Sequence, residues 1–282
     1  MLRTRIYTAL CFLLLFLVGL FYFSPVFWMT LLLAIAVIGS WEWSKLSKFS
    51  LSGSILYLIF TVLIGGELLF ILSRVTIVDP YTTQFIWLYA IALGFWILAV
   101  PYLLKFNVPI RNSMLLALIG WLLLLPTCLA LFQLRAIDPI LLLGFITAIW
   151  ISDTAAYFTG RKFGKNKLAP SISPGKTWEG VAGALVAVCI YALIWSYLAV
   201  DKTQIILYVP LLLALVVLGI LGDLFESLMK RQVGFKNSGN ILPGHGGILD
   251  RIDALTSTLP VAIFVVLLFL LLIQAIVFQC PE

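Results

Sequence analysis

The residues best suited to chemistry gather in one polar segment, Ser227–Asp253, which reads SLMKRQVGFKNSGNILPGHGGILDRID. This segment contains His245, the only histidine of the chain, together with Asp250 and Asp253, and Asp223 stands shortly before it. Charged residues are rarely used to pack a core, and the chain around this segment is 63% hydrophobic. We therefore expect the segment to perform chemistry on a charged, phosphorylated substrate.

The acids of this region recur at helical spacing. Asp223, Glu226 and Lys230 share one face if the preceding apolar span remains helical. Asp250 and Asp253 are likewise one helical turn apart. Four neighbouring acids repel one another, and a divalent cation relieves that repulsion; oxygen ligands alone favour Mg²⁺ or Mn²⁺. The simpler alternative is that Lys230 only pairs with Glu226.

A glycine-rich turn, Pro243-Gly244-His245-Gly246-Gly247, separates the two pairs of acids. His245 could be a general base, a donor to phosphate or a hydrogen-bonded structural residue, and we favour binding or structural support over catalysis. A zinc site is excluded here, because a single histidine between glycines lacks the other ligands.

A second polar loop follows Gly160 and contains the run Ser173–Thr177, which reads SPGKT. It is not a P-loop, because Pro170 stands where that motif needs its first glycine and no strand precedes it. A Gly-Lys-Thr turn at the start of a helix still offers free N–H groups and a helix dipole to an anion. We expect Lys176 and its neighbours to bind phosphate; the alternative is an ordinary helix cap in a basic loop.

Two further acids lie within apolar runs. Asp153, in AIWISDTAAYF, would cost about 2.5–3.5 kcal/mol to insert, so we favour a functional role over simple pairing with a basic residue. Glu67, in LIGGELLF, either pairs within the helices or lines a polar cavity. Gly180 and Ala184 are spaced as a helix-packing face rather than as a site.

The apolar runs predict an all-α polytopic membrane protein with about nine transmembrane helices, since about 20 apolar residues cross a bilayer. The spans are expected near 7–23, 26–43, 54–73, 85–104, 114–133, 138–159, 178–199, 204–224 and 254–278. With this count, one side of the membrane receives only Arg74, Arg135 and Lys202, and the other side receives all remaining Lys and Arg residues. The positive-inside rule then places the N-terminus in the cytoplasm and the C-terminus outside.

We expect two parts in this chain. Residues 1–135 hold about five transmembrane helices, and residues 136–282 form a catalytic membrane domain of about four helices with cytoplasmic loops 160–177 and 225–253. The net charge of +6 fits cytoplasmic loops beside anionic lipid headgroups and does not require a nucleic acid partner.

Taken together, these motifs resemble the signature of the phosphatidate cytidylyltransferase (CDP-diacylglycerol synthase) family. The matching features are Ser-x-x-Lys-Arg at Ser227–Arg231, the Pro-Gly-His-Gly-Gly turn, Asp-Arg-x-Asp at Asp250–Asp253, SPGKTWEG at Ser173–Gly180, Gly222-Asp223 and the segment around Asp153. The resemblance is strong in the C-terminal half, while the N-terminal half matches only as a series of apolar spans.

The resemblance implies transfer of CMP from CTP to phosphatidic acid, which gives CDP-diacylglycerol and pyrophosphate. It implies an enzyme of phospholipid biosynthesis in a bacterial inner membrane, with its active site facing the cytoplasm. Because the lipid phosphate is already anionic, catalysis would depend on positioning, charge neutralisation and a metal ion. A homodimer is implied by the resemblance alone.

The same resemblance implies roles for particular residues. Asp223 and Asp250 would hold Mg²⁺, with or without a second cation. The catalytic residues would be Asp223, Asp250, Asp253, Lys230 and Arg251. The substrate-binding residues would be Asp153, Ser173, Gly175, Lys176, Thr177, Arg231, Lys236, Asn237, His245, Gly246 and Gly247.

One position departs from the family pattern, which usually has Lys-Asp where this chain has Lys236-Asn237. Asparagine keeps a carbonyl oxygen but lacks the charge, so either the position tolerates the change or the enzyme is less active. Three alternative functions remain open. They are a CTP-dependent polyprenol or dolichol kinase, a divalent cation transporter that uses Asp153 and Glu67, and a non-catalytic lipid-binding scaffold.

Overall fold

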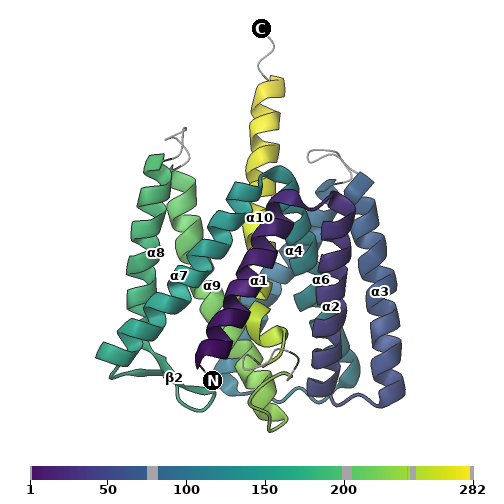
Figure 1. Ribbon diagram of the computed structural model, residues 1–282, viewed down its shortest axis with the longest axis vertical. Coiled ribbons are helices and arrows are strands. Elements are labelled where there is room, and N and C mark those ends of the chain that lie inside the picture. Colours follow the sequence, from purple (N-terminus) through teal and green to yellow (C-terminus); the bar gives the residue numbers. More distant parts are fainter. Residues whose placement is uncertain (1, 75–81, 199–204, 240, 242–245, 280–282) are drawn as a thin grey trace.

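The computed structural model describes residues 2–74, 82–198, 205–239, 241 and 246–279. Within these residues the chain is a bundle of long helices with one small β-hairpin (Figure 1). The elements are α1 (Leu2–Tyr22), α2 (Pro25–Leu46), α3 (Leu51–Arg74), α4 (Thr82–Gly94), the π-helix η1 (Phe95–Ala99), α5 (Val100–Phe106), α6 (Ser113–Ile137), α7 (Pro139–Phe163), β1 (Lys167–Ala169), β2 (Ser173–Thr177), α8 (Trp178–Leu198), α9 (Ile205–Gln232) and α10 (Leu249–Gln279).

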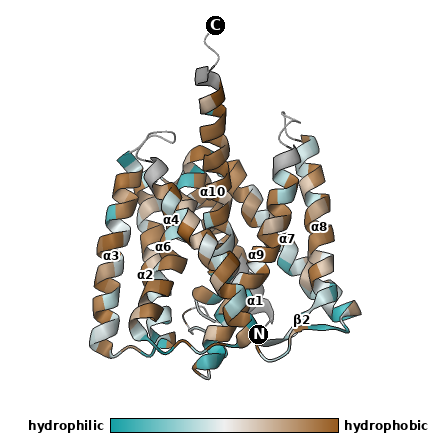
Figure 2. Cartoon of the chain, turned by 180° about the vertical axis from the view of Figure 1, so that it is seen from behind, coloured by the Kyte–Doolittle hydropathy of each residue, from teal (hydrophilic) through white to brown (hydrophobic). Residues whose placement is uncertain are grey.

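The helices confirm the predicted polytopic membrane fold. The described residues contain 8 helical stretches that are long and apolar enough to cross a membrane. One of these stretches, Phe85–Phe106, combines α4, η1 and α5. A shorter apolar stretch, Leu13–Tyr22, lies in α1, so the expected count of about nine spans is approximate. Figure 2 shows hydrophobic residues along the helices and hydrophilic residues gathered at the end that carries β2.

Short polar turns start several helices by local chemistry. Ser24 precedes α2 and accepts a hydrogen bond from the backbone N–H of Phe27, and Pro25 occupies the first helical turn. Asn112 caps α6, and Asp138 caps α7 immediately before Pro139. These residues satisfy backbone donors that a helix start leaves without partners. The boundaries predicted for these spans therefore lie close to the observed ones.

Helix α10 packs against α9, α6 and α4. Pro260 lies inside this helix and has no backbone N–H, so it cannot donate to the carbonyl of Thr256. The indole Nε1 of Trp96 donates to that carbonyl instead, at 3.1 Å. A side chain from η1 therefore satisfies the carbonyl group that the proline leaves free and ties the two helices together.

Helices α7 and α8 pack closely because small residues line their contact. Gly180 and Ala184 are both buried, which confirms the predicted packing face. A methyl group added to Gly180 would come within 2.9 Å of the carbonyl oxygen of Ala156, and one added to Gly183 within 2.3 Å of the Oγ1 atom of Thr159. The glycines thus allow the two backbones to approach, as small residues do in membrane helices.

The two polar loops are more ordered than the sequence indicated. The expected loop 225–253 is helical at both of its ends, because α9 continues to Gln232 and α10 already begins at Leu249. The expected loop 160–177 contains the antiparallel hairpin β1–β2, in which Lys167 pairs with Thr177 and Ala169 with Ser173. Backbone hydrogen bonds of the added helical turns and the hairpin account for this order. The division of the chain at residue 135 remains a prediction.

Candidate active site

The polar residues selected from the sequence converge at the end of the bundle that carries the hairpin. Because α9 is helical throughout this region, Asp223, Glu226 and Lys230 do lie on one face, as predicted. Asp250 and Asp253 occupy the first turns of α10, beside α9. The carboxylates at this end fall into two groups that differ in how their oxygens are satisfied.

The first group, which we call the open carboxylates, comprises Asp153 on α7, Asp223 on α9 and Asp253 on α10. These three side chains interact electrostatically with one another. Asp223 forms an ion pair of 2.7 Å with the Nζ atom of Lys176, yet 40% of its side chain remains exposed. It also accepts a hydrogen bond of 3.3 Å from Ser227.

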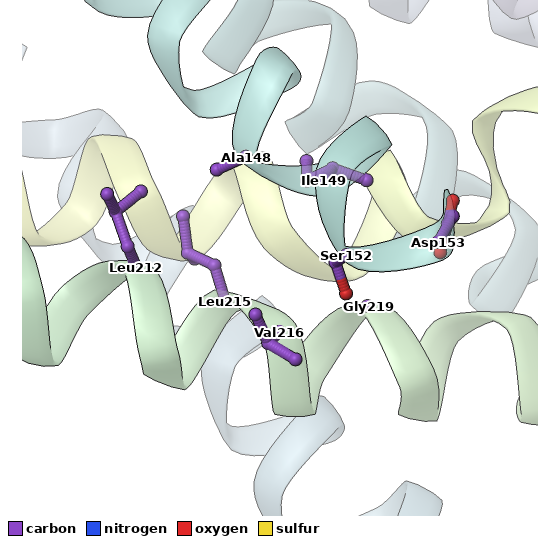
Figure 3. Close-up of a pocket in the computed structure, with 8 residues that line it drawn as sticks. All are labelled: Ala148, Ile149, Ser152, Asp153, Leu212, Leu215, Val216 and Gly219. Carbon is purple, nitrogen blue, oxygen red and sulfur yellow. The ribbon is translucent and has the colours of Figure 1, made fainter. Parts of the chain in front are cut away.

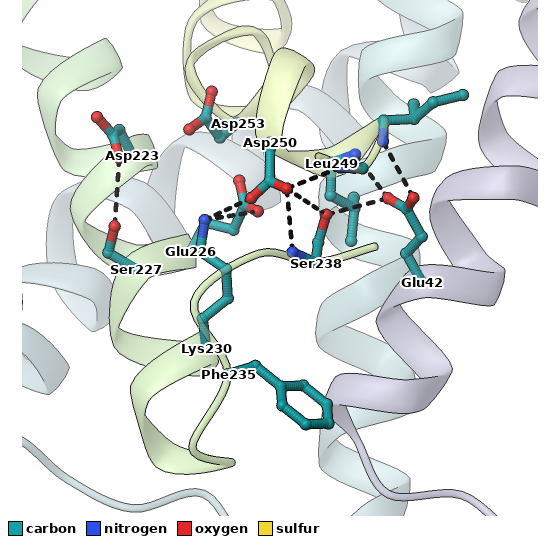
Figure 4. Close-up of polar contacts among 12 residues, drawn as sticks. Glu42, Asp223, Glu226, Ser227, Lys230, Phe235, Ser238, Leu249, Asp250 and Asp253 are labelled. Atoms are coloured by element: carbon teal, nitrogen blue, oxygen red, sulfur yellow. Dashed lines mark hydrogen bonds and ion pairs between the residues drawn. The ribbon is translucent and has the colours of Figure 1, made fainter. Parts of the chain in front are cut away.

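The other two open carboxylates have fewer partners. Asp253 accepts a hydrogen bond from the neighbouring backbone N–H of Ala254, and Figure 4 draws it without contact to the other residues shown. Asp153 makes no hydrogen bond or ion pair within the described part of the chain, and its side chain is exposed. It lines a small, mostly apolar pocket between α7 and α9 with Ser152 and Gly219 (Figure 3). The open carboxylates thus retain oxygen atoms that a cation or a ligand could use.

The second group, which we call the anchored carboxylates, comprises Glu42 and Asp250, which several hydrogen-bond donors hold, and Glu226, which an ion pair with Lys230 holds (Figure 4). The Oδ1 atom of Asp250 accepts from the Nζ atom of Lys230 at 2.6 Å. Its Oδ2 atom accepts from the backbone N–H groups of Ser238 and Gly247, at 3.0 and 2.9 Å, and from the Ser238 hydroxyl at 3.0 Å. Hydrogen bonds therefore surround Asp250, which the sequence analysis expected to hold a metal.

Lys230 lies between two of the anchored carboxylates. It is buried, and it forms ion pairs of 2.6 Å with Asp250 and 3.3 Å with Glu226. The pairing with Glu226 is the simpler alternative raised by the sequence, and the structure adds Asp250 to it. The oxygens of Glu226 are buried and have no hydrogen-bond partner, so this contact is purely electrostatic.

Sequence reasoning missed Glu42, which lies near the C-terminal end of α2. Its side chain is fully buried and accepts from the backbone N–H groups of Ile248 and Leu249 and from the hydroxyl of Ser238. A signal was present, because Glu42 is an acid at the end of an apolar run, as Asp153 is. The sequence could not show which residues, some 206 positions away, would donate to it.

The SPGKT run forms strand β2 rather than the expected turn, because its backbone pairs with β1. Thr177 ends the strand and caps α8 by accepting a hydrogen bond of 3.1 Å from the N–H of Gly180. Lys176 points to α9, where it meets Asp223 and the carbonyl oxygen of Ile220. The strand therefore places the lysine beside the open carboxylates, while Ser173 and Gly175 lie on the same strand.

The remaining predicted binding residues surround this site. Arg231 donates to the carbonyl oxygens of Ile172 and Phe235, each at 3.5 Å, from the exposed end of α9. Exposed positions are also occupied by Lys236, Asn237 and Arg251. Gly246 has a φ of 83°, a conformation that glycine adopts readily, and Gly247 donates to Asp250. His245 lies outside the described residues.

The open carboxylates fit a hard divalent cation better than the anchored ones do. Within the described ranges, no group of three or more His, Cys, Asp or Glu side chains is arranged to hold a metal on its own. Mg²⁺ needs less than this, because it commonly takes one or two carboxylates and completes its shell with water and substrate phosphates. Among the described residues, each oxygen of Asp223 has one partner, Ser227 or Lys176, and Asp253 accepts from Ala254 alone. Asp250 is more heavily engaged, because three donors converge on one of its oxygens and Lys230 binds the other.

Comparison with known proteins gives a consistent result over nearly the whole chain. Residues 3–269 match the Cytidylyltransferase family. The phosphatidate cytidylyltransferase of Haemophilus influenzae is 34% identical over 280 residues, which cover 92% of this chain and 96% of that protein. The phosphatidate cytidylyltransferase of Pseudomonas aeruginosa is 36% identical over 273 residues, covering 93% and 95%. That of Bacillus subtilis is 40% identical over 179 residues, covering 61% and 66%.

Proposed function

The chain belongs to the cytidylyltransferase family, and we propose that it transfers CMP from CTP to phosphatidate in the membrane. A phosphate oxygen of phosphatidate attacks the α-phosphorus of CTP, and the bond from that phosphorus to the β-phosphate oxygen breaks. The products are CDP-diacylglycerol and pyrophosphate. The observation that carries this proposal is the similarity to two phosphatidate cytidylyltransferases over more than nine-tenths of the chain.

The cations around the site suit two anionic substrates. Lys176, Arg231, Lys236 and Arg251 come from β2, α9, the following loop and α10, so they approach from several directions. We assign them to the triphosphate and the lipid phosphate, with backbone groups of Ser173–Thr177 as further donors. Neutralising both anions lowers the barrier to their approach, and fixed donors stabilise charge that develops in the transition state.

We assign Mg²⁺ to the open carboxylates, with Asp223 as one ligand and Asp253 as the other. Asp250 would join them only by giving up contacts to Lys230 or Ser238. The metal, when bound, would neutralise phosphate charge and orient the leaving pyrophosphate. Asp153, which interacts with Asp223 across the gap between α7 and α9, would orient the lipid end of the site.

We assign the lipid substrate to the apolar side of Asp153. The pocket at Asp153 continues into apolar side chains of α7 and α9, including Leu212, Leu215 and Val216 (Figure 3). Acyl chains would stay in this apolar region while the phosphate meets the charged end. The charge asymmetry of the loops supports placing this end on the cytoplasmic side of a bacterial inner membrane, where CTP is available.

Labelled CTP provides the decisive experiment. The purified protein is incubated with CTP labelled at either the α- or the γ-phosphate and with phosphatidate or, in parallel reactions, a polyprenol, each with and without Mg²⁺. CMP transfer moves the α-label into lipid and leaves the γ-label in pyrophosphate. Lipid labelled from the γ-position would identify a kinase instead, and absence of lipid label from both would contradict both activities.

A further inference from the structure

Glu42 joins helix α2 to the polar segment Ser227–Asp253 through a set of specific hydrogen bonds. Its Oε1 atom accepts from the N–H of Ile248 at 3.1 Å, and its Oε2 atom accepts from the N–H of Leu249 at 2.9 Å. Oε2 also accepts from the hydroxyl of Ser238 at 3.1 Å. These partners belong to the described residues that precede α10 (238, 239, 241 and 246–248, here called the loop) and to Leu249, where α10 begins. One side chain from α2 therefore binds the loop at Ser238 and again at Ile248.

No basic residue is needed to balance this buried acid. Leu249 is the first residue of α10, so the carboxylate of Glu42 lies at the N-terminal end of that helix. The free N–H groups and the partial positive charge at a helix start stabilise an anion there. A buried carboxylate without such donors would be strongly destabilising. The placement of Glu42 thus depends on α10 beginning where it does.

Two glycines of the loop leave room for the same carboxylate. A methyl group added to Gly239 would meet Glu42 Oε1 at 2.4 Å, and the three nearest atoms would all belong to Glu42. A methyl group added to Gly247 would lie 2.5 Å from both carboxylate oxygens. A Cβ atom essentially never approaches a non-bonded atom this closely, so larger residues at either position would displace the side chain of Glu42. The loop and Glu42 are therefore fitted to each other.

The hydroxyl of Ser238 extends this arrangement to the active site. It lies within 3.1 Å of Glu42 and 3.0 Å of Asp250, and its single hydrogen can be donated to only one of them at a time. Asp250 in turn holds Lys230, and Arg251 and Asp253 follow on the same first turns of α10. Movement of Glu42 would therefore be transmitted to residues that we assign to substrates and metal.

We propose that Glu42 is a positioning residue for CMP transfer, one that fixes Ser238, Ile248 and the start of α10 against α2. This inference rests on the proposed function and adds to it a residue outside the signature. Glu42 does not touch the substrates in this proposal. It acts by holding Asp250, Arg251 and Asp253 in register with the open carboxylates on α7 and α9.

The first test compares Glu42→Gln and Glu42→Asp with the matched control Glu67→Gln. Glu67 is an exposed acid on α3 with no polar partner in the described part of the chain. Glutamine cannot accept with both ends of its amide group, so at least one backbone N–H loses its partner, whereas aspartate keeps both acceptors on a shorter arm. Misplacement of the reacting groups by about 1 Å can lower the rate of an enzymatic reaction on the order of 100-fold. We therefore expect kcat to fall about 10- to 100-fold in Glu42→Gln, less in Glu42→Asp, and not in Glu67→Gln.

Amide hydrogen exchange separates positioning from a general loss of structure. In Glu42→Gln, exchange should rise in residues 238–250 while helices α3 and α8 remain as protected as in the wild type. KM for CTP should change less than kcat. Equal kcat and equal exchange in wild type and Glu42→Gln would overturn the proposal, as would exchange that rises uniformly along the chain.

A second test uses the fit between Gly239 and Glu42 and does not depend on the first. Gly239→Ala should lower kcat on its own, because its methyl group collides with Glu42. In a Glu42→Ala background the collision is absent, so the added Gly239→Ala change should cost less than about twofold. If the two sites acted independently, Gly239→Ala would lower kcat by the same factor in both backgrounds, and that outcome would contradict the proposal. Gly94→Ala on α4, where a methyl group meets nothing within 4 Å, serves as the control.

The wild-type protein, assayed in the same experiments, separates failure of the proposed function from failure of the positioning role of Glu42. A wild type that transfers no α-label contradicts the proposed function and removes the reaction that Glu42 would serve. A wild type that transfers label, together with equally active Glu42 variants, contradicts the positioning role alone.

Discussion

The open and anchored carboxylates occupy the same end of the helical bundle, and α9 and α10 carry members of both groups, yet their surroundings differ. Asp250 has four donors within hydrogen-bond distance and Glu42 has three, and the single hydroxyl hydrogen of Ser238 is shared between them. Among the residues that the structure describes, Asp253 accepts a hydrogen bond only from the adjacent backbone N–H of Ala254, and Asp153 makes no hydrogen bond or ion pair. A carboxylate held by several donors or by a buried ion pair supports the structure, whereas one with few partners remains available to a ligand. The difference separates the architecture of this site from its chemistry.

The sharpest test of this division is Asp223→Asn. Asp223 is the open carboxylate that contacts Lys176, and its removal takes away a charged ligand without disturbing a buried network. Loss of a group that stabilises the transition state commonly lowers kcat by about 100- to 1000-fold. We therefore expect the rate of CMP transfer to fall by at least about 100-fold. Thermal unfolding in detergent should hardly change. Activity near that of the wild type would remove Asp223 from the metal site.

Asp250→Asn tests the opposite side of the comparison. The substitution leaves Lys230 buried with Glu226 alone and puts an amide where an oxygen accepted several donors. Breaking a buried ion pair by removing one partner typically costs about 3–5 kcal/mol. We expect a clearly lower unfolding midpoint together with reduced transfer. If transfer fell as far as in Asp223→Asn while the unfolding midpoint stayed unchanged, Asp250 would belong with the open carboxylates.

Lys176→Met should have a smaller effect and a different kinetic signature. Its ion pair with Asp223 is partly exposed, so little stability is at stake. The lost cation should mainly weaken binding of the triphosphate, and we expect KM for CTP to rise about tenfold. Initial rates measured over a range of CTP concentrations would show this. A fall in kcat with unchanged KM would assign Lys176 to the transition state instead.

The smallest effect is expected for Asn237→Asp, which introduces the acid that the family resemblance led us to expect at this position. Asn237 is exposed and lies outside both groups of carboxylates. Surface substitutions of this kind usually change stability by less than about 0.5 kcal/mol, and we expect transfer to change less than about threefold. A rise of about tenfold or more would show that the missing charge contributes to ligand or metal binding.

Helical geometry explains what could be predicted about the site. A fixed periodicity places Asp223, Glu226 and Lys230 on one face and Gly180 and Ala184 on another, and the structure confirms both. These relations involve residues within one or two turns of the same helix, so local spacing predicts them. Local spacing does not predict which residues meet across helices, and it could not decide whether Lys230 contacts Glu226, Asp250 or a phosphate.

The sequence by itself determined the membrane-spanning helices, their approximate ends and the segments that carry chemistry. Those properties follow from local hydrophobicity, spacing and helix capping. Only the tertiary structure decided which acids are bonded and which are open, because Glu42 meets donors 206 and 207 positions away. It also decided that the SPGKT run is a strand that delivers Lys176 to Asp223. Contacts over such separations depend on how the helices pack, and no local pattern records that packing.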